Sequence, residues 1–90
     1  MEQQQTVQET KVWTDIEVKW SKVFRYWEII GDNIESGQCE NLGNTLYNIK
    51  QDAVEDAMIY AFDTSCGPAR GERVKIYSKA GKLLKTVEAA

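Results

Sequence analysis

The stretch VWTDIEVKWSKVFRYWEII, residues 12–30, decides the fold, because it fits two incompatible secondary structures. Twelve of its nineteen residues are β-branched or aromatic, and Ala, Leu, Met and Gln are absent. Summed over such a window, this composition favours strand. The first part also alternates, with Ile16 and Val18 set against Asp15 and Glu17. We therefore predict strands here, either as a hairpin or as one long bent strand.

A helix is the main alternative for the same residues. Apolar side chains also recur at the spacing of a heptad seam, which is typical of a helix that packs through one stripe. Thr14 and Glu17 would form a capping box, and Gly31 would end this helix. The strand interpretation, in turn, finds no obvious turn residue near Ser21. The seam consists of Trp13, Ile16, Trp20, Val23, Trp27 and Ile30.

The clearest element is a helix within NIKQDAVEDAMIYAFDTSCGP, residues 48–68. Apolar and small residues recur there at helical spacing, while acidic residues take the other side. Asn48 is a good N-cap, with Gln51 three residues later as in a capping box. We expect the helix to run from about Ile49 to Ser65 and to lie close on a sheet through a row of small residues. That row is Ala53, Ala57 and Ala61.

The step CGP, residues 66–68, is expected to end this helix. Gly67 can adopt the left-handed conformation past the last turn, and Pro68 cannot continue a helix. A thiolate at Cys66 would lie at the unfavourable end of the helix dipole, so we predict an ordinary thiol there. Replacing Cys66 by Ser should then leave stability within about 1 kcal/mol.

A hairpin is predicted in RVKIYSKAGKLLKTV, residues 73–87. A three-residue loop that ends on Gly81 in a bulge avoids placing Lys79 opposite Lys82. This register pairs Ile76 with Leu84 and Val74 with Thr86, so that Val74, Ile76 and Leu84 face the core. The outer face would then carry Arg73, Lys75, Tyr77, Leu83, Lys85 and Val87.

Length and composition indicate one small domain. The chain has 90 residues, of which 42% are hydrophobic, enough for a modest core. Residues 1–11 are expected to form a polar, partly disordered tail without a signal sequence, and residues 12–90 the domain. With a further strand within residues 38–47, the predicted class is α+β: an antiparallel sheet of three to five strands with one packed helix and a C-terminal hairpin. We expect a cytoplasmic protein.

From Tyr26 onward the layout resembles a family of short bacterial proteins of unknown function. The resemblance covers residues 26–87. It lies in a strand with a tryptophan (RYWEII), a polar step into an alanine-bearing helix (NIKQDAVEDAMIYA) and a final pair of strands about a glycine turn (VKIYSKAGKLLKT). The resemblance implies a β-β-α-β-β layout and says nothing about an activity.

Catalytic and metal chemistry are poorly supported. The chain has no histidine, the usual general base and the commonest metal ligand. Its two cysteines, Cys39 and Cys66, cannot complete a four-ligand zinc site, and we expect both to be reduced thiols, with a disulfide or an intermolecular bridge as the alternative. The acidic residues of the helix are spaced as a solvated face. We predict that the protein is not an enzyme and that it binds neither a metal ion nor a cofactor.

Charge is split unevenly along the chain. Residues 1–69 hold five Lys/Arg and twelve Asp/Glu, whereas residues 70–90 hold six Lys/Arg and two Asp/Glu. Opposite charge on two parts of a chain suits self-association or docking on a partner. We therefore predict a protein-interaction module, either a homodimer or a protein that docks on a partner, such as a phage or plasmid accessory protein that blocks a host machine. No membrane association is expected.

Two candidate sites follow from the predicted hairpin register and the aromatic residues. Aromatic and aliphatic side chains outside a core often anchor interfaces. The predicted partner-binding residues are Tyr77, Leu83, Val87, Trp13 and Trp27. The alternative is single-stranded nucleic-acid binding through the basic hairpin, by Lys75, Lys79, Lys82, Lys85 and Arg73.

Overall fold

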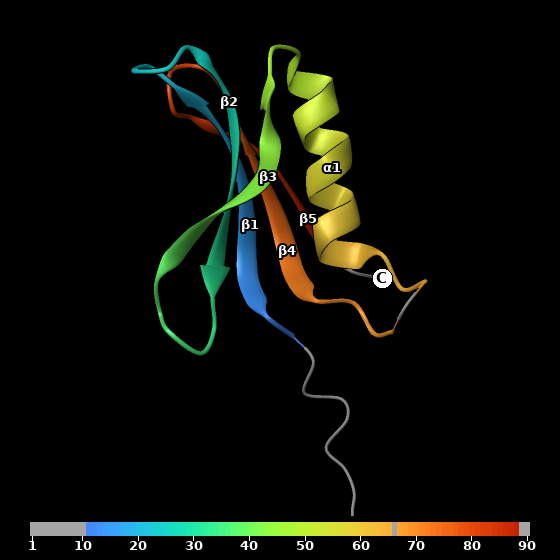
Figure 1. Ribbon diagram of the computed structural model, residues 1–90. Coiled ribbons are helices and arrows are strands. Elements are labelled where there is room, and N and C mark those ends of the chain that lie inside the picture. The colour runs from blue at the N-terminus through green and yellow to red at the C-terminus, as the bar shows by residue number, and fades with distance from the viewer. Residues whose placement is uncertain (1–10, 66, 89–90) are drawn as a thin grey trace, which may run out of the picture.

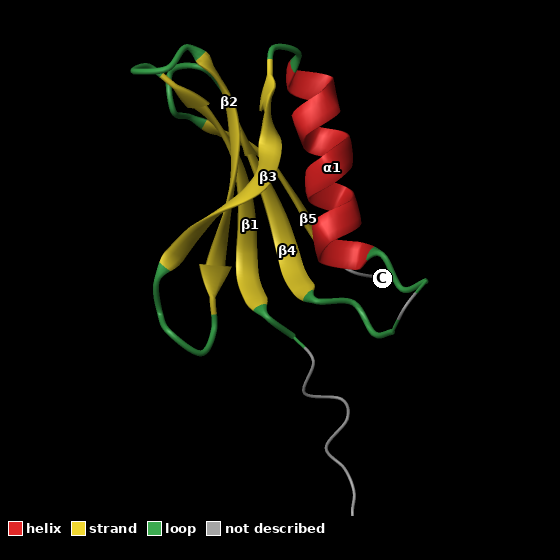
Figure 2. Ribbon diagram, viewed as in Figure 1, coloured by secondary structure: helices red, strands yellow, loops and turns green. Residues whose placement is uncertain are grey.

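The computed structural model describes residues 11–65 and 67–88. One helix lies on one face of a five-stranded sheet, which makes a two-layer α+β fold (Figures 1 and 2). The strand interpretation of residues 12–30 is confirmed as a hairpin, and the helix alternative is wrong. The elements are β1 (Trp13–Ser21), β2 (Tyr26–Asn33), β3 (Cys39–Tyr47), α1 (Lys50–Phe62), β4 (Gly71–Tyr77) and β5 (Leu83–Glu88).

The sheet is mixed, so the prediction of a purely antiparallel sheet was wrong. The strand order is β3-β2-β1-β4-β5, and the central pair, β1 with β4, is parallel. The other three pairs are antiparallel. The physical reason is the crossover: α1 carries the chain back along the sheet, so that β4 starts at the same end as β1. From Tyr26 onward the order is β-β-α-β-β, with β1 added before it.

The β1–β2 turn is made without glycine. The Ser21 carbonyl accepts a hydrogen bond from the Arg25 amide at 2.8 Å, and the Ser21 hydroxyl accepts one from the Phe24 amide at 3.1 Å. Arg25 adopts the left-handed conformation, with φ 61°. A serine side chain that satisfies a turn amide therefore replaces the turn residue that the sequence did not show.

A bulge in β1 turns Trp13 into the core. The β1–β2 register shifts between Trp13 and Ile16, which brings both side chains to the helix side. The Trp13 ring covers Gly31, where an added Cβ would lie 2.6 Å from Trp13 Cδ1. Its indole N–H donates to Glu40 Oε1 at 3.2 Å. Trp13 is consequently only 8% exposed.

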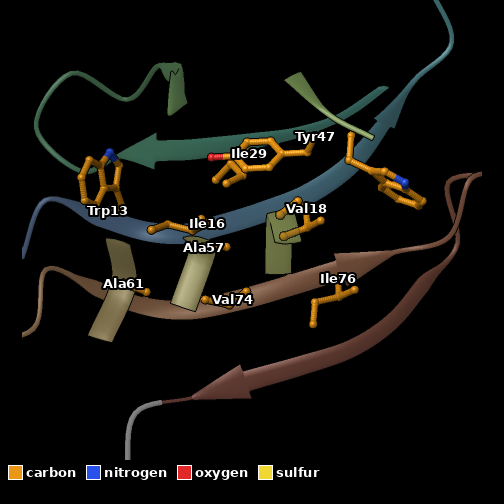
Figure 3. Packing of buried hydrophobic residues seen from close by; sticks show 11 residues of the cluster. Trp13, Ile16, Val18, Ile29, Tyr47, Ala57, Ala61, Val74 and Ile76 are labelled. Carbon is orange, nitrogen blue, oxygen red and sulfur yellow. The ribbon is translucent and has the colours of Figure 1, made fainter. Parts of the chain in front are cut away.

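The row of small residues brings α1 close to the sheet, as expected. Ala53, Ala57 and Ala61 are fully buried, and Ala57 and Ala61 lie over Ile16 and Val74 of the central strands (Figure 3). Because alanine side chains are short, the helix can approach β1 and β4 closely without leaving voids. The core therefore sits between α1 and the four strands β1 to β4.

The start of α1 differs in detail from the prediction. Ile49, not Asn48, is the N-cap, and no side chain caps the helix there. Gln51 does not close a capping box; its amide donates to Glu55 Oε2 one turn along the helix, at 3.3 Å. Because packing of the alanine row holds the helix in place, a missing cap is tolerated.

The end of α1 was predicted wrongly. The helix ends at Phe62, and Asp63 follows in an extended conformation. The Asp63 carboxylate accepts hydrogen bonds from the Ser65 amide at 3.0 Å and hydroxyl at 3.1 Å, which lower the pKa of Asp63. This local turn stops the helix before Gly67 is reached. Cys66 lies outside the described residues.

The β4–β5 loop is confirmed. The Gly81 amide donates to the Ser78 carbonyl at 3.0 Å, and the Ser78 amide donates to the Lys82 carbonyl at 2.8 Å. Gly81 has φ 92°, as its place in the bulge requires. The loop therefore consists of the three residues 79–81.

The register beyond this loop is one residue off the prediction. A second bulge places Ile76 opposite Lys85 and Val74 opposite Val87. Lys85 and Val87 thus lie on the helix side, and Leu84 is 54% exposed instead of buried. A lysine is tolerated opposite Ile76 because α1 contacts β1 to β4 but, among the described elements, not β5.

We expect Gly71→Ala to destabilise the protein by about 1–3 kcal/mol, the usual cost of overpacking a core. The added Cβ would lie 2.9 Å from Ala61 Cβ and 3.0 Å from its Cα, so the helix must move. Urea unfolding monitored by circular dichroism measures the change. In a double-mutant cycle, Ala61→Gly should relieve part of the cost, whereas strict additivity would contradict this contact.

Candidate functional site

Two surfaces of the described chain are both hollowed and chemically distinctive. The first lies where α1 leaves β5 uncovered. An open groove of about 850 Å³ runs between the two elements. Its floor and walls are largely apolar, with Val54 and Met58 partly buried against the core. The residues that line it are Lys50, Gln51, Val54, Glu55, Met58, Ile59, Ile76 and Lys85.

Ile59 is the most prominent apolar side chain of this groove. It is 58% exposed, although it is a large aliphatic residue on a helix that packs on a core. A further hollow of about 500 Å³ adjoins the groove on the other side of Ile59 and is lined by Ile59 together with Tyr60 and Pro68. Ile59 therefore stands between two depressions, a position that favours contact with another molecule.

The rim of the groove carries both signs of charge. Lys50 and Lys85 stand on it together with Glu55. The Lys50 ammonium lies 5.0 Å from the centre of the Trp27 ring, a cation–π contact that keeps the lysine at the rim. A mixed rim around an apolar floor is the usual anatomy of a protein–protein contact.

The outer face of the sheet is polar and internally neutralised. Asp15 accepts a hydrogen bond from Arg73 Nε at 2.7 Å and lies 3.3 Å from Lys75 Nζ. The hydrogen bond that Arg73 donates to Asp15 raises the pKa of Arg73. Lys19 pairs in the same way with Glu17 at 3.0 Å. Because its charges are paired, the outer face can be exposed to water without a second helix or sheet to cover it.

The second hollow surface lies between the β1–β2 and β4–β5 turns. It encloses about 270 Å³ and is lined by Trp20 and Tyr77 together with three lysines. The Lys79 ammonium lies over the Trp20 ring, 4.3 Å from its centre. Trp20 also packs edge-to-face on Trp27, with 5.4 Å between ring centres. The lysines are Lys19, Lys22 and Lys79.

The predicted partner-binding residues do not form one surface. Tyr77 and Leu83 pair across β4 and β5 on the outer face, and Leu83 is 46% exposed. Val87 lies on the opposite side of β5, where it packs partly against the core. Trp13 and Trp27 are 8% and 5% exposed and belong to the core, so they offer a partner little surface.

The predicted nucleic-acid residues are also divided. Arg73 and Lys75 are paired with Asp15 on the outer face. Lys85 stands on the rim of the groove, because of the second bulge. Lys79 and Lys82 remain together at the β4–β5 turn. The sequence missed Trp20, Lys19 and Lys22 as their neighbours, because no local pattern shows that the two turns meet.

Cys39 is the thiol that the structure describes, and it is free and exposed. Its Sγ donates a hydrogen bond to Asp32 Oδ1 at 3.0 Å, and this bond raises the pKa of the thiol. A raised pKa makes it a poor nucleophile at neutral pH. Within the described residues, no group of three or more Cys, Asp or Glu is placed to hold a metal ion.

Comparison of the chain with protein-family models, curated proteins and solved structures found no match. The resemblance of residues 26–87 to short bacterial proteins therefore stays a prediction. Across the described part of the chain, no helix is both long and apolar enough to span a membrane.

We expect Cys39 to be alkylated slowly by iodoacetamide near pH 8, because Asp32 holds the proton on the thiol. Asp32→Asn should remove this effect and speed the reaction at that pH, and the rate of the parent protein should rise as pH increases through the raised pKa. Mass spectrometry of the peptide that contains Cys39 gives the rate at each pH. Equal rates in the two proteins would contradict the hydrogen bond.

Proposed function

We propose that this protein is a non-enzymatic interaction module that self-associates through the groove between α1 and β5. The observation that carries the proposal is that α1 contacts β1 to β4 and leaves β5 uncovered, with Ile59 exposed beside an apolar groove. Contiguous apolar surface with a polar rim typically marks a site of protein contact.

The charges on the rim of the groove are complementary to those of a second copy of the chain. A two-fold interface brings the same patch of both copies together, so the patch must be self-complementary. The rim meets this condition, since Glu55 of one copy can face Lys85 of the other, twice. The apolar floor, with Met58 and Ile59, would then be buried from both sides.

Side-chain packing, not strand addition, is the expected mode of contact. The free edge of β5 is interrupted by the bulge near Leu84, and Lys85 points to the helix side. Bulges and inward-pointing charges are devices that block edge-to-edge pairing. The exposed side of α1 and the groove beside it remain available for contact with a second copy.

We expect a monomer–dimer equilibrium with a dissociation constant in roughly the micromolar range, as measured by sedimentation. Ile59→Asp should raise that constant at least about tenfold, because it buries a charge at the centre of the contact. Glu55→Lys or Lys85→Glu alone should weaken the dimer, and the two together should restore it in part.

The outer face provides the matched control. Tyr77→Ala with Leu83→Ser should leave the dimer unchanged, since both residues lie on the side of the sheet away from α1. Loss of the dimer in this variant, with Ile59→Asp unaffected, would move the interface to the outer face. A chain that stays monomeric at about 1 mM would overturn self-association altogether.

A further inference from the structure

Positive charge gathers on the strands and turns at one end of the sheet, where the first turns of α1 add Lys50 and the carboxylates Asp52, Glu55 and Asp56. The β1–β2 and β4–β5 turns lie together at this end, at the top of Figure 1. Beyond the level of the Glu17–Lys75 pair, the carboxylates of the strands and turns are Glu17 and Glu28. The cations of the strands and turns at the same end are Lys19, Lys22, Arg25, Lys75, Lys79, Lys82 and Lys85.

The opposite end of the sheet has the reverse balance. Its cations on strands and their flanking residues are Lys11, Arg70 and Arg73. Its carboxylates are Asp15, Asp32, Glu35, Glu40, Glu72 and Glu88. The parallel pairing of β1 with β4 creates this separation, because it places the ends of both strands, and the turns that follow them, side by side.

The lysines of the two turns are not neutralised. Lys22, Lys79 and Lys82 are exposed, and within the described part of the chain none of them has a carboxylate at ion-pair distance. By contrast, Lys19 forms an ion pair with Glu17, and Asp15 forms ion pairs with Arg73 and Lys75. An anion that approaches this end therefore meets three lysines without a competing carboxylate.

Aromatic rings stand among these lysines. Trp20 is half-buried, with Lys79 over one face of its ring, and Tyr77 has Lys19 5.3 Å from its centre. At the tip of the β1–β2 turn, Phe24 is 67% exposed and stacks on Tyr26 with 5.8 Å between ring centres. The exposed Phe24 ring contributes nothing to the core, so it is free to contact another molecule.

We propose that this basic end, formed by Lys22, Lys79, Lys82, Trp20 and Phe24, binds single-stranded nucleic acid. Single strands carry phosphates for the lysines and unpaired bases for the rings, and such binding combines a positive track with stacking. A duplex hides the faces of its bases, so it satisfies only the lysines. This inference is independent of the groove between α1 and β5.

Lys79 connects the lysines that would bind phosphates with the Trp20 ring that would stack on a base. Its ammonium occupies the ring face of Trp20 at 4.3 Å. A base that stacks on this face displaces the ammonium, which can then pair with the neighbouring phosphate. Because Trp13 and Trp27 are buried, quenching of tryptophan fluorescence on binding would report chiefly on Trp20.

The test is a titration of the full chain with oligothymidylate at low salt, about 50 mM, followed by tryptophan quenching and by anisotropy of a labelled strand. We expect binding whose log affinity falls with log salt at about −0.7 per phosphate contact. Lys22→Gln with Lys79→Gln should weaken it at least tenfold and reduce the slope by about 1.4. Trp20→Phe should abolish most of the quenching.

The matched control is Lys11→Gln with Arg70→Gln, which removes the same charge at the opposite end of the sheet. It should leave affinity within about twofold. Equal loss in both double variants would show attraction by net charge alone and overturn the site. Absence of binding at about 100 µM protein would do the same, as would equal competition by polyglutamate, which has charge but no bases.

Discussion

The close approach of α1 to the central strands is the constraint on which the rest of the structure depends. Ala57 and Ala61 lie over Ile16 and Val74, all four fully buried, and a Cβ added at Gly71 would lie only 2.9 Å from Ala61 Cβ. The helix is thereby fixed over β1 and β4 and reaches β2 and β3, but it is too narrow to cover β5 as well. The uncovered strand, and with it the groove beside Ile59, follows from this placement.

Local composition was enough to predict where the helix and the strands lie. It did not predict the bulges, the side chains that face the core or the residue at which the helix ends. The β-branched and aromatic residues of 12–30 indicated strands, and the alanine row indicated a helix on a sheet. The bulges near Asp15 and Leu84 leave no mark in composition, yet each shifts which side chains face the core. The helix end depended on Asp63, a short polar residue that satisfied its own turn before Gly67 was reached.

The candidate sites were harder to predict because they join distant segments. A count along the sequence places positive charge after residue 69, but the structure gathers Lys19 and Lys22 with Lys79 and Lys82 at one end of the sheet. The parallel pair of β1 and β4, which nothing in the sequence indicates, is responsible. For the same reason Trp20 was not among the predicted site residues, although it lines the hollow between the turns.

That central parallel pair also sets the order in which the chain can assemble. The β1–β2–β3 meander and the β4–β5 hairpin are each built from neighbouring segments. The join between them is not: Asp15 and Arg73, which pair across it, are 58 residues apart. Closing so long a loop costs chain entropy before any contact is gained. We therefore expect the union of these two locally paired halves, through β1, β4 and the helix laid over them, to be slower than the formation of either half.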